Sequence, residues 1–214
     1  MIFCEKLSKK FGETFALQDL SFCAEGKIAV FGFNGAGKST LSKIFAGILK
    51  PSSGKIEIFG MKPSESPELR RKIGLVTHNP MVYRELTVKE NLEFYAKLYR
   101  VKDWRSVLEN LRLSDKLNSR LSELSKGFVQ RVAIARALLI KPKVLILDEA
   151  LSGLDLESKR EVLRMIKDFN GILVFSTHNF EEAQFCQTFI VLEKGKLAYF
   201  GESYEKALRA LSAI

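Results

Sequence analysis

The chain alternates between short apolar runs and longer segments in which hydrophobic positions recur at helical spacing. Seven of the short runs have the length of a β-strand, and we expect each to form one. They cover residues 2–7, 17–22, 28–31, 55–59, 73–77, 144–147 and 172–175. A Lys-Gly pair at 194–195 additionally predicts a hairpin turn.

Helix start and stop signals accompany several of the longer segments. A T-x-x-E capping box at Thr87 opens an amphipathic run that continues to Tyr99. A helix that begins at Ser39 is expected to end near Gly47, because glycine favours the left-handed residue that follows many helices. The same spacing predicts helices at 103–111, at 127–139 before Pro142, at 157–169 with Gly171 as a cap, and from Tyr204 onward.

The order of these elements indicates the fold class. Strands and helices alternate, and the central strands are apolar throughout, which favours a parallel sheet covered on both faces. Between residues 79 and 135 the character is helical. We therefore expect one α/β domain over 1–214, with its core in 1–78 and 136–214 and an inserted helical subdomain at 79–135.

The charge balance is basic, with a net charge of +9 at pH 7. A basic protein can favour nucleic acid, an anionic membrane surface or a polyphosphate. Here Lys and Arg are spread along the chain between acidic residues, without a polybasic arm. This pattern is typical of a solvated surface, with some bias toward phosphate and the membrane.

Compartment signals all favour the cytosol. No apolar run approaches the ~20 residues that cross a bilayer, and the first residues lack the pattern of a signal peptide. Cys4, Cys23 and Cys186 are widely spaced. This spacing fits reduced thiols better than a disulfide framework or a zinc site.

A glycine-rich loop carries the first chemical signal. Residues 32–39 read G-F-N-G-A-G-K-S and match the phosphate-binding pattern G-x-x-x-x-G-K-S/T. In this loop the backbone N–H groups point at phosphate oxygens, Lys38 brings a cation to the β- and γ-phosphates, and Ser39 offers its hydroxyl to Mg²⁺. A plain glycine-rich turn is disfavoured, because an apolar strand precedes the loop and a helix follows it.

A second signal is an apolar strand that ends in two carboxylates, since residues 144–149 read V-L-I-L-D-E. Alone this pattern is weak. Downstream of a phosphate-binding loop it indicates that Asp148 holds Mg²⁺ and that Glu149 polarises a water against the γ-phosphate.

Three further motifs identify a family. Residues 124–128 read L-S-K-G-F and, with the helix that follows, resemble the L-S-G-G-Q signature of the ABC (ATP-binding cassette) family. Residues 152–155 (S-G-L-D) resemble its D-loop, and 176–178 (S-T-H) its switch histidine. The resemblance covers nearly the whole chain. It implies a P-loop NTPase core with a mainly parallel sheet, an antiparallel β portion near the N-terminus and an inserted α-helical subdomain.

The resemblance also implies residue roles. In that family the nucleotide lies between two head-to-tail protomers, so Ser125 and Gly127 of one protomer would face the γ-phosphate held by Lys38 of the other. Phe11 stands where the family places an aromatic that stacks on adenine, although packing in the core is the alternative. Motifs and resemblance together assign catalysis to Lys38, Glu149 and His178; nucleotide binding to Phe11, Asn34, Gly35, Ala36, Gly37, Lys38, Ser39, Thr40, Ser125, Gly127 and Asp155; and Mg²⁺ to Ser39, Asp148 and His78.

Three positions depart from the family pattern. In the signature, Lys126 replaces a glycine and Phe128 replaces the glutamine. His78 stands where the family usually has the Q-loop glutamine, and its neighbour Asn79 could supply the amide instead. A neutral imidazole has one acceptor and no carbonyl, which leaves metal contact by His78 open. The residues assigned to phosphate contact are retained, so we expect a catalytically competent site.

The leading interpretation is a Mg²⁺-dependent ATPase that converts ATP and water to ADP and phosphate. As a subunit of an ABC transporter it would lie on the inner face of the cell membrane and drive a separate integral-membrane permease, docked through 79–100. ATP would join two copies, or this chain and a related one. The motifs look like those of bacterial export cassettes, with a weak similarity to the haem-exporter ATPase of cytochrome c maturation.

Two alternatives belong to other classes. A non-transport ABC protein acting on DNA or translation is disfavoured, because the chain has neither a long coiled-coil insertion nor a second cassette; no nucleic acid partner is expected. A regulatory nucleotide-binding module without turnover is disfavoured by Glu149. The sequence does not name the cargo.

Overall fold

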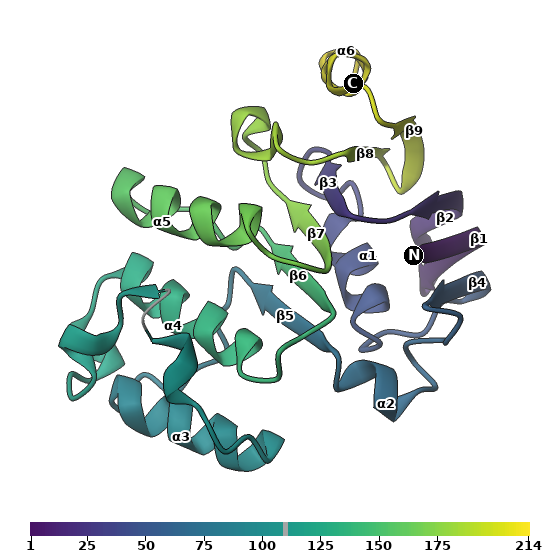
Figure 1. Ribbon diagram of the computed structural model, residues 1–214. Helices are drawn as coiled ribbons and strands as arrows, with labels where there is room; N and C mark the ends of the chain where they lie inside the picture. The colour runs from purple at the N-terminus through teal and green to yellow at the C-terminus, as the bar shows by residue number, and fades with distance from the viewer. Residues whose placement is uncertain (109–110) are drawn as a thin grey trace.

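The computed structural model describes residues 1–108 and 111–214 and shows a central sheet with helices on both faces (Figure 1). Its six strands lie in the order β5-β6-β7-β3-β8-β9. Neighbouring strands from β5 to β8 are parallel, and β9 is antiparallel to β8. The strands are β3 (Lys27–Phe31), β5 (Ile73–Thr77), β6 (Val144–Asp148), β7 (Ile172–Ser176), β8 (Thr188–Glu193) and β9 (Lys196–Gly201).

A second, antiparallel sheet lies near the N-terminus, as the resemblance implied. Its strands have the order β2-β1-β4. They are longer than the apolar runs indicated and comprise β1 (Ile2–Phe11), β2 (Thr14–Ala24) and β4 (Ser53–Ile58). The predicted fold class, an α/β core with a mainly parallel sheet and an antiparallel portion, is confirmed.

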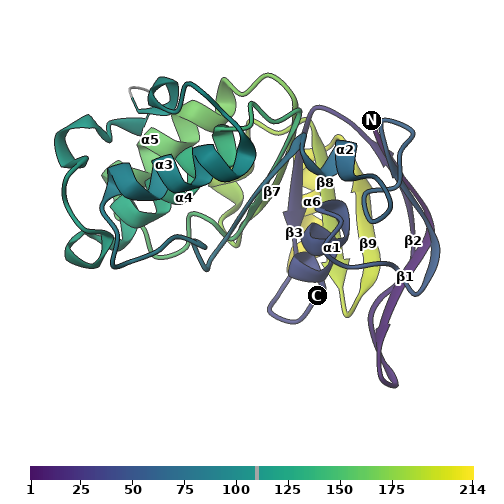
Figure 2. The same ribbon diagram turned by 90° about the horizontal axis from the view of Figure 1, so that it is seen from below.

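Helices cover both faces of the parallel sheet. Figure 2 shows from below that the two groups of helices lie on opposite sides of it. The helices α3 (Val88–Tyr99), α4 (Lys126–Leu138) and α5 (Leu156–Lys167) lie on one side, and α1 (Lys38–Phe45) faces the antiparallel sheet. The remaining elements are α2 (Pro67–Arg70), α6 (Tyr204–Ser212) and the 3-10 turns η1 (Arg105–Val107), η3 (Ser114–Lys116), η4 (Leu121–Glu123) and η5 (Phe180–Ala183).

Two hydrophobic cores explain why the central strands are apolar throughout. In β6, Leu145 and Leu147 belong to the core beneath α3, α4 and α5. Val144 and Ile146 point the other way, into the core shared with α1 and the antiparallel sheet. Because successive side chains of a strand face opposite sides of the sheet, a strand covered on both faces has no solvated position.

Several local predictions are confirmed. The Thr87 hydroxyl accepts the N–H of Glu90 at 3.1 Å, and the Glu90 carboxylate accepts the N–H of Thr87 at 2.8 Å, which completes the capping box. Gly47 follows α1 with a φ of 71°. The hairpin between β8 and β9 turns at Lys194 and Gly195, both with positive φ.

Two predicted helices differ in the structure. In place of the α-helix expected at 103–111, residues 103–108 contain a 3-10 turn at Arg105–Val107, and residues 109 and 110 of the prediction lie outside the described residues. The Asp103 carboxylate accepts the N–H groups of Arg105 and Ser106, both at 3.2 Å, and this local capping favours a tight turn. The helix expected at 157–169 ends at Lys167, so that Gly171 lies beyond its cap.

Two further observations concern membranes and thiols. In the part of the chain that the structure describes, no helix has both the length and the apolar character needed to cross a bilayer. Cys4, Cys23 and Cys186 are free thiols.

Candidate nucleotide-binding site

The carboxyl ends of the parallel strands bring the predicted motifs together. The strand register places Thr77 of β5, Asp148 of β6 and Ser176 of β7 side by side, and β3 pairs with β7 on the other side. The loops that follow β3, β5 and β6 line a cleft of about 380 Å³. Its lining residues are Ala16, Asn34, Gly35, Ala36, Gly37, Lys38, Ser39, Thr40, His78 and Glu149. Such an edge is where ligands bind in open α/β sheets.

The phosphate loop requires glycine at two positions. Gly37 has a φ of 107°, and a Cβ there would lie 2.6 Å from the carbonyl oxygen of Ala16. A Cβ on Gly32 would lie 2.5 Å from the carbonyl oxygen of Leu192. The loop can therefore pack tightly and turn directly into α1, whose first N–H groups are available to an anion.

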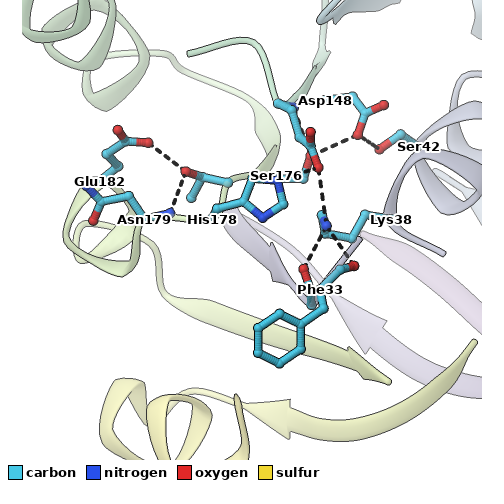
Figure 3. A network of polar contacts seen from close by, with 11 residues as sticks. Phe33, Lys38, Ser42, Asp148, Ser176, His178, Asn179 and Glu182 are labelled. Carbon is cyan, nitrogen blue, oxygen red and sulfur yellow. Dashed lines mark hydrogen bonds and ion pairs between the residues drawn. The ribbon is translucent and has the colours of Figure 1, made fainter. Parts of the chain in front are cut away.

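Lys38 is a fixed cation in this loop, with 4% of its surface exposed. Its Nζ donates to the carbonyl oxygens of Gly32 at 2.7 Å and Phe33 at 3.2 Å (Figure 3). It also lies 3.2 Å from Oε1 of Glu149. The loop thus holds the charge in place through its own backbone.

Asp148 is 1% exposed and is oriented by two hydroxyl groups. Its Oδ1 accepts from Ser176 Oγ at 2.9 Å and from Ser42 Oγ at 3.4 Å (Figure 3). Neither serine was among the predicted site residues. Ser176 could have been found as the first residue of the S-T-H motif, and Ser42 as the residue one helical turn after Ser39.

Glu149 takes a strained backbone conformation directly after β6. Its φ is 53°, a left-handed value that is uncommon for residues other than glycine. The N–H of Glu149 donates to the carbonyl oxygen of Ser176 at 3.2 Å and to Ser176 Oγ at 3.0 Å. This reversal turns Glu149 into the cleft while Asp148 stays buried.

The Glu149 carboxylate lies between two basic groups. Its Oε1 is 3.2 Å from Lys38 Nζ and 2.9 Å from His178 Nε2. Burial raises the pKa of Glu149, but the hydrogen bond and charge of Lys38, together with His178, outweigh burial and hold the pKa below its usual range. The carboxylate is therefore ionised at neutral pH and can accept a proton.

His78 follows the end of β5, which contacts the signature helix. His78 is exposed and lines the cleft. The preceding carbonyl oxygen, that of Thr77, accepts a hydrogen bond from Gln130 Nε2 of α4 at 3.2 Å. Metal contact by His78 stays a prediction.

The signature packs against the D-loop of the same chain. Ser125 caps α4 by accepting the N–H of Phe128 at 3.2 Å. A Cβ on Gly127 would lie 2.5 Å from Ser158 Oγ and 3.0 Å from Asp155 Oδ2. Asp155 in turn caps α5 by accepting the N–H of Ser158 at 2.9 Å. Among the described residues, the signature and D-loop motifs do not line the cleft around Lys38.

The two signature departures have structural roles. A Cβ on Gly153 would lie 2.5 Å from Lys126 Nζ, so the lysine side chain covers the D-loop turn. Phe128 is buried, and the Arg131 guanidinium lies 4.7 Å from the centre of its ring. Phe128 therefore belongs to the core.

Phe11 lies at the end of β1 and is 50% exposed, with Lys9 Nζ 5.1 Å from its ring centre. It does not line the cleft in the part of the chain that is described. Phe15, across the same hairpin, is also exposed and directly precedes Ala16 of the lining. Phe15 was not among the predicted site residues. Adenine stacking by Phe11 stays a prediction.

Comparisons with known proteins agree with this geometry. Residues 17–152 match the family model described as ABC transporter. The chain is 37% identical over 203 residues to the Nod factor export ATP-binding protein I of Rhizobium johnstonii, covering 89% of this chain and 65% of that protein. It is 33% identical to a probable sulfate/thiosulfate import ATP-binding protein of Chlorella vulgaris, covering 95% of this chain and 92% of the relative.

A solved structure is similar over nearly the whole chain. It is a dimeric ATP-binding cassette in a post-hydrolysis state bound to ADP and Pi, at a TM-score of 0.81 and 28% identity, covering 94% of this chain and 98% of that one. The chain spans about 65% of the length of the Nod factor export protein. The matched family model, the relatives and the phosphate-loop geometry together place this chain in the ABC transporter family.

Proposed function

We propose that this chain is the ATP-binding and ATP-hydrolysing subunit of an ABC transporter. The observation that carries the proposal is the position of Glu149, an ionised carboxylate held between Lys38 and His178 at the edge of the phosphate-loop cleft. A nucleotide-binding module without turnover would have no need of a strained, ionised carboxylate at this point. The similar structure that holds ADP and Pi supports hydrolysis.

The reaction assigns a step to each of these side chains. The Glu149 carboxylate takes a proton from water as the water oxygen attacks the γ-phosphate. Lys38 and the loop N–H groups stabilise the negative charge that develops on the transferred phosphoryl group. His178 holds Glu149 through its Nε2, and we propose that it also contacts the same phosphate, as the family resemblance implies.

The residues present fit Mg²⁺ brought in with the nucleotide. Among the described residues there is no group of three or more His, Cys, Asp and Glu arranged for a metal. Asp148 presents a buried carboxylate whose Oδ1 is oriented by Ser176 and Ser42, and Ser39 lines the cleft. One carboxylate and a hydroxyl, completed by phosphate oxygens, are a ligand set that Mg²⁺ prefers. Bound there, Mg²⁺ would neutralise phosphate charge.

The partners follow from the same family. We propose that two copies, or this chain and a related one, hold ATP between the phosphate loop of one and Ser125 and Gly127 of the other. A separate integral-membrane permease would dock on 79–100 and receive the conformational change of the ATPase cycle, with 79–135 moving as a helical subdomain.

We propose that the protein lies on the inner face of the membrane and binds no nucleic acid. Its relatives include export and import proteins, so they leave the cargo open.

A phosphate-release assay on the purified chain tests the proposal. We expect ADP and phosphate to form from ATP, and chelation of Mg²⁺ by EDTA to stop the reaction. If each site needs two chains, the rate per chain should rise with protein concentration. ATP binding without phosphate release at any concentration would contradict the proposal.

His78 provides a separate prediction. We expect His78→Gln to keep or raise the rate of ATP hydrolysis, because an amide restores the carbonyl acceptor that imidazole lacks. The other histidine of the chain supplies the matched control, since His178→Gln should lower kcat by about 10²-fold. A similar loss in His78→Gln would instead make His78 part of the chemistry.

A further inference from the structure

A buried carboxylate lies just outside the cleft. Glu182, in η5, is 8% exposed. Burying a charged group is unfavourable unless the group is paired and hydrogen-bonded. Glu182 is both, because Lys159 Nζ lies 3.0 Å from its Oε1. Thr177 Oγ1 donates to Oε2 at 2.6 Å (Figure 3). The reaction proposed above gives this carboxylate no role.

Thr177 links Glu182 to the switch histidine. Its Oγ1 donates to Glu182 and accepts the N–H of Asn179 at 3.1 Å. These hydrogen bonds therefore hold the turn at Thr177, before His178, and at Asn179, after it. The His178 side chain is 46% exposed. Among the described residues its polar contact is the one to Glu149, so the turn sets where the imidazole lies.

Lys159 connects this turn to α5. It follows Ser158, which packs against Gly127 of the signature, and it belongs to the first turns of the helix that Asp155 caps. A cavity of about 140 Å³ lies between α5 and the turn, lined in part by Lys159, Thr177, His178 and Glu182. The cavity leaves room for the turn to shift once the ion pair no longer holds it.

We propose that Glu182, paired with Lys159, is a positioning residue that holds the Thr177–His178 turn so that the imidazole meets Glu149. Glu182 acts through Thr177 and does not touch substrate. The proposal rests on ATP hydrolysis at the site described above. Displacement of a reacting group by about 1 Å can cost up to 10²-fold in rate, so losing the pair should lower kcat by about tenfold and leave the KM for ATP unchanged.

Conservative variants separate this role from simple support of the fold. Thr177→Val removes the hydroxyl at nearly constant shape, whereas Thr177→Ser keeps it. Glu182→Gln keeps an acceptor for Thr177 but removes the charge that pairs with Lys159. Glu65→Gln is the matched control, since it makes the same change in an exposed ion pair with Lys62, 3.4 Å apart and remote from the cleft.

The experiment measures kcat and KM for ATP in each variant and records the imidazole NMR signals. The chain has two histidines, so His78→Gln assigns the signal of His178. We expect about tenfold lower kcat and a displaced His178 signal in Thr177→Val and Glu182→Gln. Thr177→Ser and Glu65→Gln should match the wild type in both measurements.

The outcomes are distinguishable from failure of the proposed function. A wild-type chain without ATPase activity would reject hydrolysis itself, while the His178 signal would still report the turn. An active wild type with unchanged kcat and an unmoved His178 signal in Thr177→Val and Glu182→Gln would overturn the positioning role. Equal losses in Thr177→Ser and Thr177→Val would overturn it as well, because the hydroxyl would then not matter.

Discussion

Glu149→Gln is expected to lower ATP turnover by about 10²–10⁴-fold while leaving ATP binding intact or stronger. The amide keeps the shape of the carboxylate and its hydrogen bonds, but it cannot accept the proton of the attacking water. It also removes a negative charge that lies 3.2 Å from Lys38 Nζ and would face the γ-phosphate. The rate of ATP hydrolysis should therefore fall while the affinity for ATP stays the same or rises.

The measurement pairs phosphate release with size-exclusion chromatography and light scattering. ATP that persists between two chains stabilises the dimer by mass action, so Glu149→Gln should be a dimer with ATP and a monomer without it. A control is Glu65→Gln, which makes the same change in the exposed ion pair with Lys62 and should behave as the wild type. Turnover at the wild-type rate in a monomeric Glu149→Gln chain would show that Glu149 is not the base.

Lys38→Ala is expected to remove nearly all nucleotide binding, and hydrolysis with it. The Lys38 ammonium is buried and held by the carbonyl oxygens of Gly32 and Phe33, which fix the cation at the phosphate loop. Loss of the cation also removes the main influence that lowers the pKa of Glu149, which should therefore rise.

Calorimetric titration with ATP measures this effect directly. Lys43→Ala is the matched control, because Lys43 lies on the exposed side of the same helix. Thermal unfolding of both variants should stay close to that of the wild type. ATP affinity in Lys38→Ala equal to that of the control would reject the phosphate-loop assignment.

Much of the site was predictable because its chemistry lies in contiguous residues. The glycine loop around Lys38, the acidic pair and the switch histidine each follow an apolar strand, and parallel strands bring their carboxyl ends to one edge. The capping box at Thr87 was predictable for the same reason, since its two residues are three apart. Local spacing encodes these features completely.

The parts that escaped prediction depend on contacts between distant segments. Ser42 and Asp148 are 106 positions apart, and Lys159 and Glu182 are 23 apart. No periodicity marks such pairs. The hydrophobic spacing of 103–111 suits a helix, yet the structure has a 3-10 turn at Arg105–Val107, where Asp103 accepts the N–H of Arg105. Likewise, only the packed structure shows that Lys126 of the signature covers Gly153 of the D-loop.

The left-handed backbone of Glu149 bears on how this protein can evolve. A residue other than glycine held at such a φ costs the folded state on the order of 1 kcal/mol or more. Glycine would adopt the same φ of 53° without that cost. The same substitution would, however, leave the buried Lys38 ammonium without its carboxylate partner, 3.2 Å away. The backbone strain at Glu149 is therefore tied to the ion pair, and a cassette released from the demand for turnover should lose this side chain only together with Lys38.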